Sequence, residues 1–294
     1  MNWWRISSDP RQDQQLAPEL LVRSRDGGAT AAAHRTPKRT SSDLSMTSNP
    51  AGLNQRQTLH RDVWQRKAVI RLLYQEFHRQ LLAACGAGRI LDIGSGTAHI
   101  KDVRPDVIST DILSFPGIDV VADAHRLPFA NGAFSGVIML DVLHHLERPV
   151  AFLKEAARVL KPGGRLAMIE PAMTPLARWF YDRFHEEPVD MTADPFAMVT
   201  VGLKHDPFDA NQAIPSLLFS TEQARKRFEQ TVPGLRVRRI DWQSLIAYPL
   251  SGGFQPWSLL PAGWVKPILS MEGRTPAAIR KLLAFRMMVV LERQ

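Results

Sequence analysis

The feature that most constrains the fold of this chain is a series of short apolar runs separated by turns and helical stretches. Strands buried on both faces of a parallel sheet have this pattern, because neither of their faces is reserved for polar residues. Strand and helix alternate along the chain, which predicts an α/β fold with a doubly wound, mostly parallel sheet. Five apolar runs occupy residues 90–93, 107–110, 120–122, 136–140 and 165–169.

Helical patterns lie before, between and after these runs. Asp62 is a candidate N-cap for a helix whose apolar residues recur every three or four positions as far as Leu81, and Gly86 would end it. Another helix is expected to begin at Pro149 and to stop at Gly163. Further helices are predicted over residues 173–184 and 221–230, and further strands over 235–241 and 284–291.

Composition limits the class of protein. The chain has 294 residues, of which 45% are hydrophobic, enough for one large globular domain or two modest ones. The net charge of +8 is spread along the sequence without a dense basic block, so we expect no nucleic-acid partner. Cys85 is the only cysteine, which excludes an intramolecular disulfide, and no secretory signal is visible. We therefore expect a cytoplasmic protein.

Residues 1–58 are expected to form a disordered tail. No Phe, Trp or Tyr occurs between Arg5 and Val63, so this part of the chain can bury little apolar surface to offset the entropy of ordering. The folded domain is expected to span residues 59–294.

Glycines and carboxylates follow the first three apolar runs, where the carboxyl ends of parallel strands would bring them together. Gly94, Ser95 and Gly96 form a loop that lets the backbone approach a ligand. Asp111 ends the second strand, where its carboxylate can accept hydrogen bonds from the two hydroxyls of a ribose. Asp123 follows the third strand beside an apolar shelf that suits an adenine. Each element alone also fits an ordinary turn or cap.

Together with two later segments, these motifs resemble the class I S-adenosylmethionine-dependent methyltransferases of the methyltransferase 11 type. The later segments are His144-His145 and Leu160-Lys161-Pro162-Gly163-Gly164, and the resemblance runs from Arg89 to Pro171. It implies a Rossmann-like methyltransferase sheet with an antiparallel last strand, with insertions after strands five and six. It also implies a cofactor-binding half over 89–171, substrate-side helices and a lid over 172–283, and the last strand over 284–291.

The resemblance implies S-adenosylmethionine as the cofactor and assigns its contacts by position. The glycine loop would hold the methionine and ribose parts, and Asp111 the ribose hydroxyls. Ile112 would pack beside the adenine, while Leu140 and Asp141 would line the methyl end. The implied cofactor-binding residues are Asp92, Gly94, Ser95, Gly96, Asp111, Ile112, Asp123, Ala124, Leu140 and Asp141. Ala98 replaces the family's third glycine, and the segment from Gly96 to Val107 leaves room for only a short first helix.

Methyl transfer requires alignment of the acceptor and, for some acceptors, removal of a proton. His144 and His145 are the candidate catalytic bases, since imidazole titrates near neutrality, although one of the pair can equally be structural. Arg178, Tyr181 and His185 could share a helix face that holds a polar substrate. We expect no metal ion.

Residues 242–265 carry no charge, but their prolines and glycines exclude a single membrane-spanning helix. They could form an insertion packed on the sheet edge, an apolar lid over the acceptor pocket, or a docking surface for a membrane or a second copy. We favour the lid over docking, which predicts a small, largely hydrophobic methyl acceptor and no membrane contact. The sequence indicates neither the identity of this acceptor nor the oligomeric state.

Two other classes of protein share part of the pattern. An NAD(P)-binding oxidoreductase would need glycine or alanine at the position of His99, where an imidazole fits poorly. A catalytically inactive methyltransferase-like module would keep the cofactor residues and lose the substrate pocket.

Overall fold

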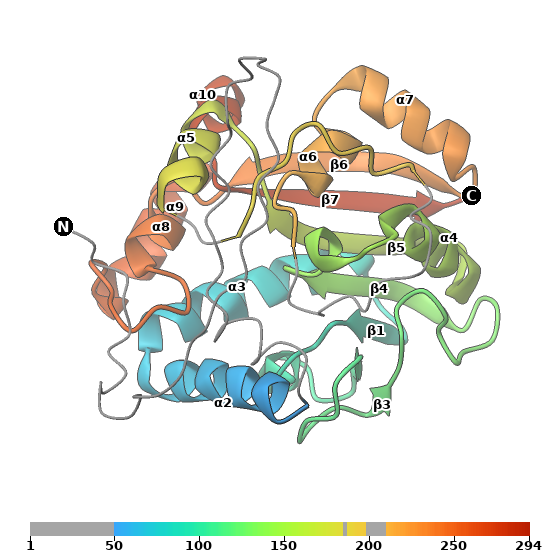
Figure 1. Cartoon of the computed structure of the whole chain (residues 1–294), viewed down its shortest axis with the longest axis horizontal. Helices are drawn as coiled ribbons and strands as arrows, with labels where there is room; N and C mark the ends of the chain where they lie inside the picture. The colour runs from blue at the N-terminus through green and yellow to red at the C-terminus, as the bar shows by residue number, and fades with distance from the viewer. Residues whose placement is uncertain (1–49, 185–186, 198–209) are drawn as a thin grey trace, which may run out of the picture. The chain divides into compact units, whose positions relative to one another are not determined.

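The computed structural model describes residues 50–184, 187–197 and 210–294. In these ranges the chain forms one seven-stranded sheet in the order β3-β2-β1-β4-β5-β7-β6, with helices on both faces (Figure 1). Only β7 runs antiparallel to its neighbours, so the expected doubly wound sheet with an antiparallel last strand is confirmed. The strands are β1 (Ile90–Ile93), β2 (Ile108–Asp111), β3 (Val120–Val121), β4 (Phe134–Leu140), β5 (Leu160–Pro171), β6 (Leu235–Gln243) and β7 (Arg286–Arg293).

Helices fill the connections between the strands. The α-helices are α2 (Pro50–Arg66), α3 (Ala68–Cys85), α4 (Pro149–Val159), α5 (Pro175–Phe184), α6 (Ile214–Phe219), α7 (Glu222–Thr231), α8 (Ala247–Ser251), α9 (Val265–Gly273) and α10 (Ala277–Leu283). Three short 3-10 helices are η1 (His99–Asp102), η2 (Leu143–His145) and η3 (Ala262–Trp264). The described ranges contain no helix that is both long and apolar enough to cross a membrane.

The predicted start of the first helix is wrong. Asp62 is not an N-cap, because it lies inside α2, which begins at Pro50. Residues 50–58, placed in the disordered tail from sequence, therefore belong to a helix, and the rest of that tail lies outside the described residues. A break at Lys67 separates α2 from α3, and the Lys67 ammonium donates to the carbonyl oxygens of Gly253 and Gln255, at 2.7 and 2.8 Å.

The end of α4 also differs from the prediction. The helix stops at Val159 rather than at Gly163, because Leu160 already pairs with Phe134 of β4. Strand β5 consequently begins five residues earlier than expected from its apolar run, and Gly163 and Gly164 lie within it.

The core has two layers, one on each face of the sheet. Alternate residues of β4 enter different layers: Val137 packs with the residues of α4, α6 and α7, and Ile138 packs with those of α3 and α9. This follows from the two-residue period of a strand, which points successive side chains to opposite faces. Each fully buried side chain of this size stabilises the fold by about 1.5–3 kcal/mol.

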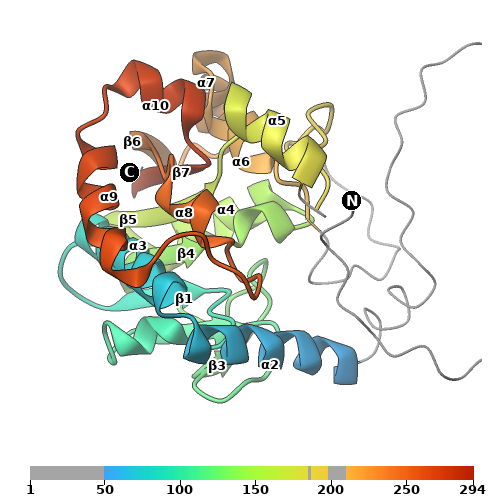
Figure 2. The ribbon, with the colours of Figure 1, turned by 90° about the vertical axis from the view of Figure 1, so that its left-hand side faces the viewer.

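The helices of the insertions lie at one end of the strands. Helix α5 follows the end of β5, α8 follows the end of β6, and α10 directly precedes β7. These helices therefore stand at the carboxyl ends of the parallel strands, on the side that Figure 2 turns toward the viewer, while α7 lies at the opposite side in Figure 1.

Candidate functional site

The loop after β1 has a backbone that a ligand can approach. Gly94 has a φ of +66°, and a Cβ on it would lie 2.5 Å from a methyl group of Val142. Gly96 has a φ of +54°, and apart from its chain neighbours no described atom lies within 4 Å of the place a Cβ would take. Gly94 thus fits the loop against the end of β4, and Gly96 leaves its backbone accessible to a ligand.

Asp111 ties the end of β2 to this loop. Its Oδ2 accepts from the Gly96 amide at 2.8 Å, and its Oδ1 accepts from the Leu113 amide at 2.9 Å. Burial raises the pKa of this carboxyl, against the lowering effect of the backbone hydrogen bonds. Each oxygen of a carboxylate keeps a second lone pair, so two ribose hydroxyls can still be bound. Ile112, next to it, is 52% exposed and offers apolar surface for an adenine.

Asp92 supports the loop from inside. Its Oδ2 accepts from the Ser95 hydroxyl at 2.6 Å, while its carbonyl oxygen accepts from the Thr110 hydroxyl at 2.9 Å. Burial raises the pKa of Asp92 to about 7. Of the predicted cofactor residues, Asp92 is therefore placed to hold the loop in shape, with its side chain already engaged.

Asp123 and Ala124 follow β3 as expected, but the carboxylate already has partners. It accepts from the backbone amide of His125 at 2.8 Å and lies 2.7 Å from the Nδ1 atom of the same residue. Burial alone would raise the pKa of Asp123, and these hydrogen bonds lower it overall. The side chain is exposed, so it remains available at the rim of the site.

Asp141, after β4, belongs to a buried polar cluster that sequence reasoning missed. Its carboxylate accepts from the Tyr74 hydroxyl at 2.8 Å and from the guanidinium of Arg286. That guanidinium lies 3.8 Å from the ring centroid of Tyr248. Burial would raise the pKa of Asp141, but the Arg286 charge holds it below its usual value. A signal existed, because Arg286 is a charged residue directly before the apolar run of β7. The preceding residue, Leu140, is half-buried.

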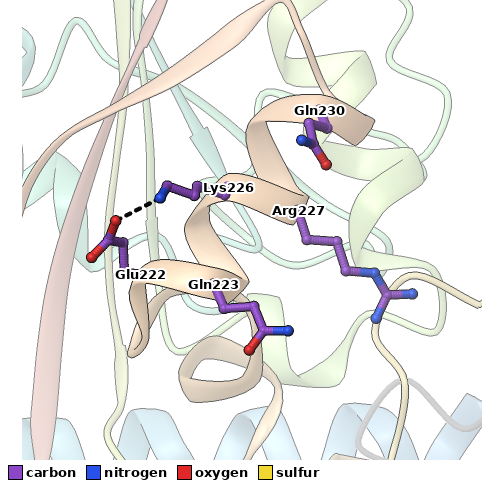
Figure 3. Close-up of a pocket in the computed structure, with 5 residues that line it drawn as sticks. All are labelled: Glu222, Gln223, Lys226, Arg227 and Gln230. Atoms are coloured by element: carbon purple, nitrogen blue, oxygen red, sulfur yellow. Dashed lines mark ion pairs between the residues drawn. The ribbon is translucent and has the colours of Figure 1, made fainter.

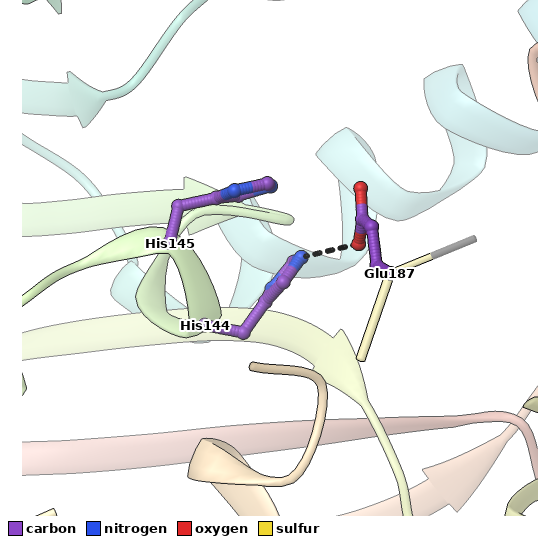
Figure 4. Close-up of side chains that lie close together, drawn as sticks. All are labelled: His144, His145 and Glu187. Carbon is purple, nitrogen blue, oxygen red and sulfur yellow. Dashed lines mark ion pairs between the residues drawn. The ribbon is translucent and has the colours of Figure 1, made fainter. Parts of the chain in front are cut away.

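His144 lies between the carboxylates of Glu170 and Glu187, of which Figure 4 shows the second. Its Nδ1 atom is 2.6 Å from Oε2 of Glu170, whose Oε1 accepts from the amides of Val142 and Leu143 at 2.9 and 2.8 Å. Its Nε2 atom lies 3.8 Å from the carboxylate of Glu187. Burial lowers the pKa of His144, but the hydrogen bond and charge of Glu170, with Glu187 and Asp141, raise it overall.

The two histidines have different surroundings. His144 is buried and bonded to Glu170, whereas His145 is only half-buried, with its ring centroid 4.2 Å from that of His144. Glu187 is oriented by Gln212, which donates to its carboxylate. Neither Glu170 nor Glu187 was assigned a catalytic role from sequence.

His144, His145 and Glu187 are also the one group within the described ranges that could hold a metal ion, since one ligand atom of each lies within 4.8 Å of the others. Ligand atoms bound to a tetrahedral ion at about 2.1 Å lie about 3.4 Å apart, so this group would have to contract. The absence of a metal stays a prediction.

The short first helix expected after the glycine loop is present as η1. Ala98, in place of a third glycine, adopts the left-handed conformation with a φ of +59°. The His99 ring stacks on Trp64 of α2, with centroids 3.6 Å apart and planes 7° apart. Burial lowers the pKa of His99 to about 3, so the ring is neutral.

Two predicted substrate-side features are revised. Arg178 and Tyr181 do not share a polar face. Arg178 is exposed beside Asp182, whereas Tyr181 is buried and its hydroxyl donates to the carbonyl oxygen of Phe285. His185 lies outside the described residues. In the predicted lid, Phe254 packs against Tyr74 and stacks on His60, but Trp257 and Trp264 are exposed.

Hollows elsewhere on the molecule do not coincide with these residues. One of about 610 Å³ lies along α7, and its lining residues, Glu222, Gln223, Lys226, Arg227 and Gln230, all come from that helix (Figure 3). Another of about 370 Å³ lies between α3, the end of β6 and α9. The first has a wall on one side only, and neither includes Asp111 or His144 in its lining.

Comparisons with known proteins agree on the class. Residues 81–168 match the family model described as a methyltransferase domain. A demethylmenaquinone methyltransferase of Beutenbergia cavernae is 37% identical over 118 residues, which cover 34% of this chain and 49% of the relative. The ubiquinone/menaquinone biosynthesis C-methyltransferase UbiE of Cereibacter sphaeroides is 42% identical over 67 residues, covering 22% and 27%. The chain thus spans half or less of the length of these curated relatives.

A solved structure shares the fold. A S-adenosylmethionine-dependent methyltransferase of Thermotoga maritima, described as a possible histamine N-methyltransferase, aligns with a TM-score of 0.50 at 15% identity. The alignment covers 82% of this chain and 99% of that one. In its sheet order, its glycine loop and the family match over residues 81–168, the chain is thus similar to the class I S-adenosylmethionine-dependent methyltransferases. The cofactor of this class is S-adenosylmethionine.

The described residues fit that cofactor. Gly96 faces open space, Asp111 has spare acceptor capacity beside it, and Ile112 presents an exposed apolar side chain. The dinucleotide alternative fits less well, because η1 is a single turn and its His99 is stacked on α2.

Proposed function

We propose that this protein transfers the methyl group of S-adenosylmethionine to a small, largely hydrophobic acceptor. The observation that carries the proposal is the Asp111 carboxylate, held on the Gly96 amide at the accessible side of the glycine loop. The names of the relatives, methyltransferases of demethylmenaquinone and of ubiquinone/menaquinone biosynthesis, support aromatic apolar acceptors as the first compounds to test.

The chain's residues divide the task of binding. Asp111 would hold the ribose hydroxyls, Ile112 the adenine, and the backbone at Gly96 the methionine part. When bound, the cofactor would supply an activated methyl group, and attack of the acceptor atom in line on the methyl carbon would release S-adenosylhomocysteine. Asp141 is neutralised by Arg286 and Tyr74, so it would present a paired rather than a free carboxylate to the methyl end.

His144 is proposed to accept the proton that the acceptor loses. Glu170 occupies its Nδ1 atom, which leaves Nε2 as the nitrogen that can take a proton from an acceptor hydroxyl. The same carboxylate stabilises the imidazolium that forms. His145, beside it, would then position the acceptor rather than transfer the proton.

The pH dependence tests the role of His144. Only its neutral form can accept a proton, and its pKa lies above the usual 6.5 because Glu170, Glu187 and Asp141 outweigh burial. We expect kcat/KM to rise with pH through a pKa above 6.5. The His144→Gln variant should lose at least about a hundredfold in kcat, as loss of general-base catalysis costs. Glu170→Gln should move the rise to lower pH. If His144→Gln keeps the wild-type rate and profile, the acceptor is methylated by alignment alone.

The acceptor class is tested by measuring S-adenosylhomocysteine release with matched compounds. Apolar hydroquinones should turn over, and the same rings carrying sulfonate groups should not. Turnover restricted to highly charged acceptors would contradict the hydrophobic assignment while leaving methyl transfer intact.

A further inference from the structure

The exposed apolar side chains of this protein are concentrated at one edge of the sheet. Of the fifteen large hydrophobic side chains that are exposed in the described ranges, twelve belong to α5 or to the segment between β6 and β7. The most exposed include Leu259 at 72%, Trp264 at 61%, Leu282 at 54% and Trp179 at 47%. We call α5, α8, η3, α9 and α10, with the loops between the last four, the apolar face.

These elements form two contacting groups, which the short segment between α9 and α10 joins along the chain. Helix α5 contacts α10, while α9 contacts both α8 and η3. All of them lie on the side that Figure 2 presents, at the carboxyl ends of the parallel strands. Monomeric soluble proteins rarely expose contiguous apolar surface of this kind without a binding role.

The exposed charges on this face are mostly positive. Its exposed ionic side chains are the cations Arg178, Arg183, Lys266, Arg274 and Lys281, with the single acid Asp182. Asp182 is 3.9 Å from Arg178 and is therefore already neutralised in part. The one other acid of the face, Glu272, is buried and accepts from the amides of Ile246 and Ala247.

Exposed tryptophan and leucine among cations suit the boundary of an anionic bilayer. Tryptophan prefers the headgroup level, apolar side chains enter the acyl region, and each nearby cation contributes about 1 kcal/mol toward an anionic surface. A second copy of this chain suits the face poorly, because a two-fold contact would bring its cations against the same cations.

We propose that the apolar face docks this protein on an anionic lipid surface. This proposal departs from the expectation of no membrane contact, which followed from favouring a lid for the segment between the last two strands; Trp257 and Trp264 of that segment are exposed. The face borders the carboxyl edge that carries the cofactor loop and His144. If the proposed function holds, an apolar acceptor could then be taken from the bilayer.

The test is flotation of the full chain with vesicles, without cofactor or acceptor, so that its outcome does not depend on methyl transfer. We expect binding to phosphatidylcholine vesicles that contain about a third phosphatidylglycerol, little binding to pure phosphatidylcholine, and a loss of at least about fivefold at 0.5 M salt.

Two double variants separate the apolar from the ionic contribution. Trp179→Ser with Trp264→Ser, and Lys266→Glu with Lys281→Glu, should each reduce the bound fraction at least about fivefold. The matched control Lys154→Glu with Lys161→Glu changes the net charge equally at exposed sites outside the face and should bind as the wild type does.

Because all substituted side chains are exposed, melting temperatures should stay unchanged and binding losses can be attributed to the face. Absence of flotation with the anionic vesicles at low salt would overturn the proposal. So would equal losses in the control, or light scattering that shows a dimer dispersed by Trp179→Ser with Trp264→Ser, since the face would then bind a second copy.

Discussion

Asp111 has two tasks at the level of single residues: it fixes the glycine loop through the Gly96 amide, and we expect it to bind ribose. Asp111→Ala should weaken S-adenosylhomocysteine binding at least about tenfold, or about 1.4 kcal/mol, if two hydrogen bonds are lost. Calorimetry measures this, with Asp106→Ala, an exposed carboxylate paired with Arg104, as the control. Unchanged affinity in Asp111→Ala would remove this residue from the site.

The pair of Asp141 and Arg286 predicts a large stability effect. Arg286→Met should destabilise the fold by up to about 3 kcal/mol, because it leaves the Asp141 carboxylate, whose side chain is 23% exposed, without its counter-charge. Adding Asp141→Asn should recover part of the loss, as measured by urea unfolding. A single variant as stable as the wild type, or a double variant no better than the single, would contradict this account.

The stability lost in Arg286→Met should depend on pH, because it depends on the charge of Asp141. The Asp141 pKa is lowered in the folded state, so its pairing stabilises above the unfolded pKa and the contribution is lost as pH falls through the folded one. The difference in stability between wild type and Arg286→Met should therefore shrink in acid. A difference that is constant from pH 7 to pH 3 would show that packing, not charge, sets the effect.

Sequence reasoning found the acidic positions but not their partners. Asp92 lies in β1, Asp111 ends β2, and Asp123 and Asp141 follow β3 and β4 as predicted, since a strand end is a local feature. The partner of Asp141 lies 145 residues away in the chain, and that of His144 lies 26 residues away. Which carboxylates are free for a ligand depends on these distant contacts, and no local pattern contains them.

At the scale of elements, strands were more predictable than helix ends. The five apolar runs form β1 to β5, because a strand that is buried on both faces consists of consecutive apolar residues and can be recognised locally. The start of α2 before Asp62 was missed because the contacts that place this helix are tertiary: Trp64 is buried on His99, and the following Lys67 is fixed by carbonyl oxygens beyond residue 250. Its polar first half gave no periodic apolar signal.

The tail before α2 can be tested by truncation, and α2 itself by substitution. Removing residues 1–45 should leave the melting temperature unchanged, whereas Trp64→Ala should cost about 3–5 kcal/mol, as expected for a large buried aromatic side chain. Leu59→Ala, at an exposed position of the same helix, is the control and should change stability by less than about 0.5 kcal/mol. A fall of several degrees on removing residues 1–45 would show that the tail packs on the domain.

At the scale of the whole molecule, one edge of the sheet gathers most of the chemistry. Parallel strands end there with the glycine loop, Asp111 and His144, and the connections before and after β7 place the apolar face beside them. This sidedness follows from the topology of an open α/β sheet, in which ligands bind at the carboxyl ends of the strands.

The central claim is that this edge binds S-adenosylmethionine. Calorimetry of the full chain with S-adenosylhomocysteine, NAD and NADP tests it without knowledge of the acceptor. The account predicts one site for S-adenosylhomocysteine and no heat of binding for either dinucleotide. Binding of NAD or NADP, or no binding of S-adenosylhomocysteine at millimolar concentration, would contradict it.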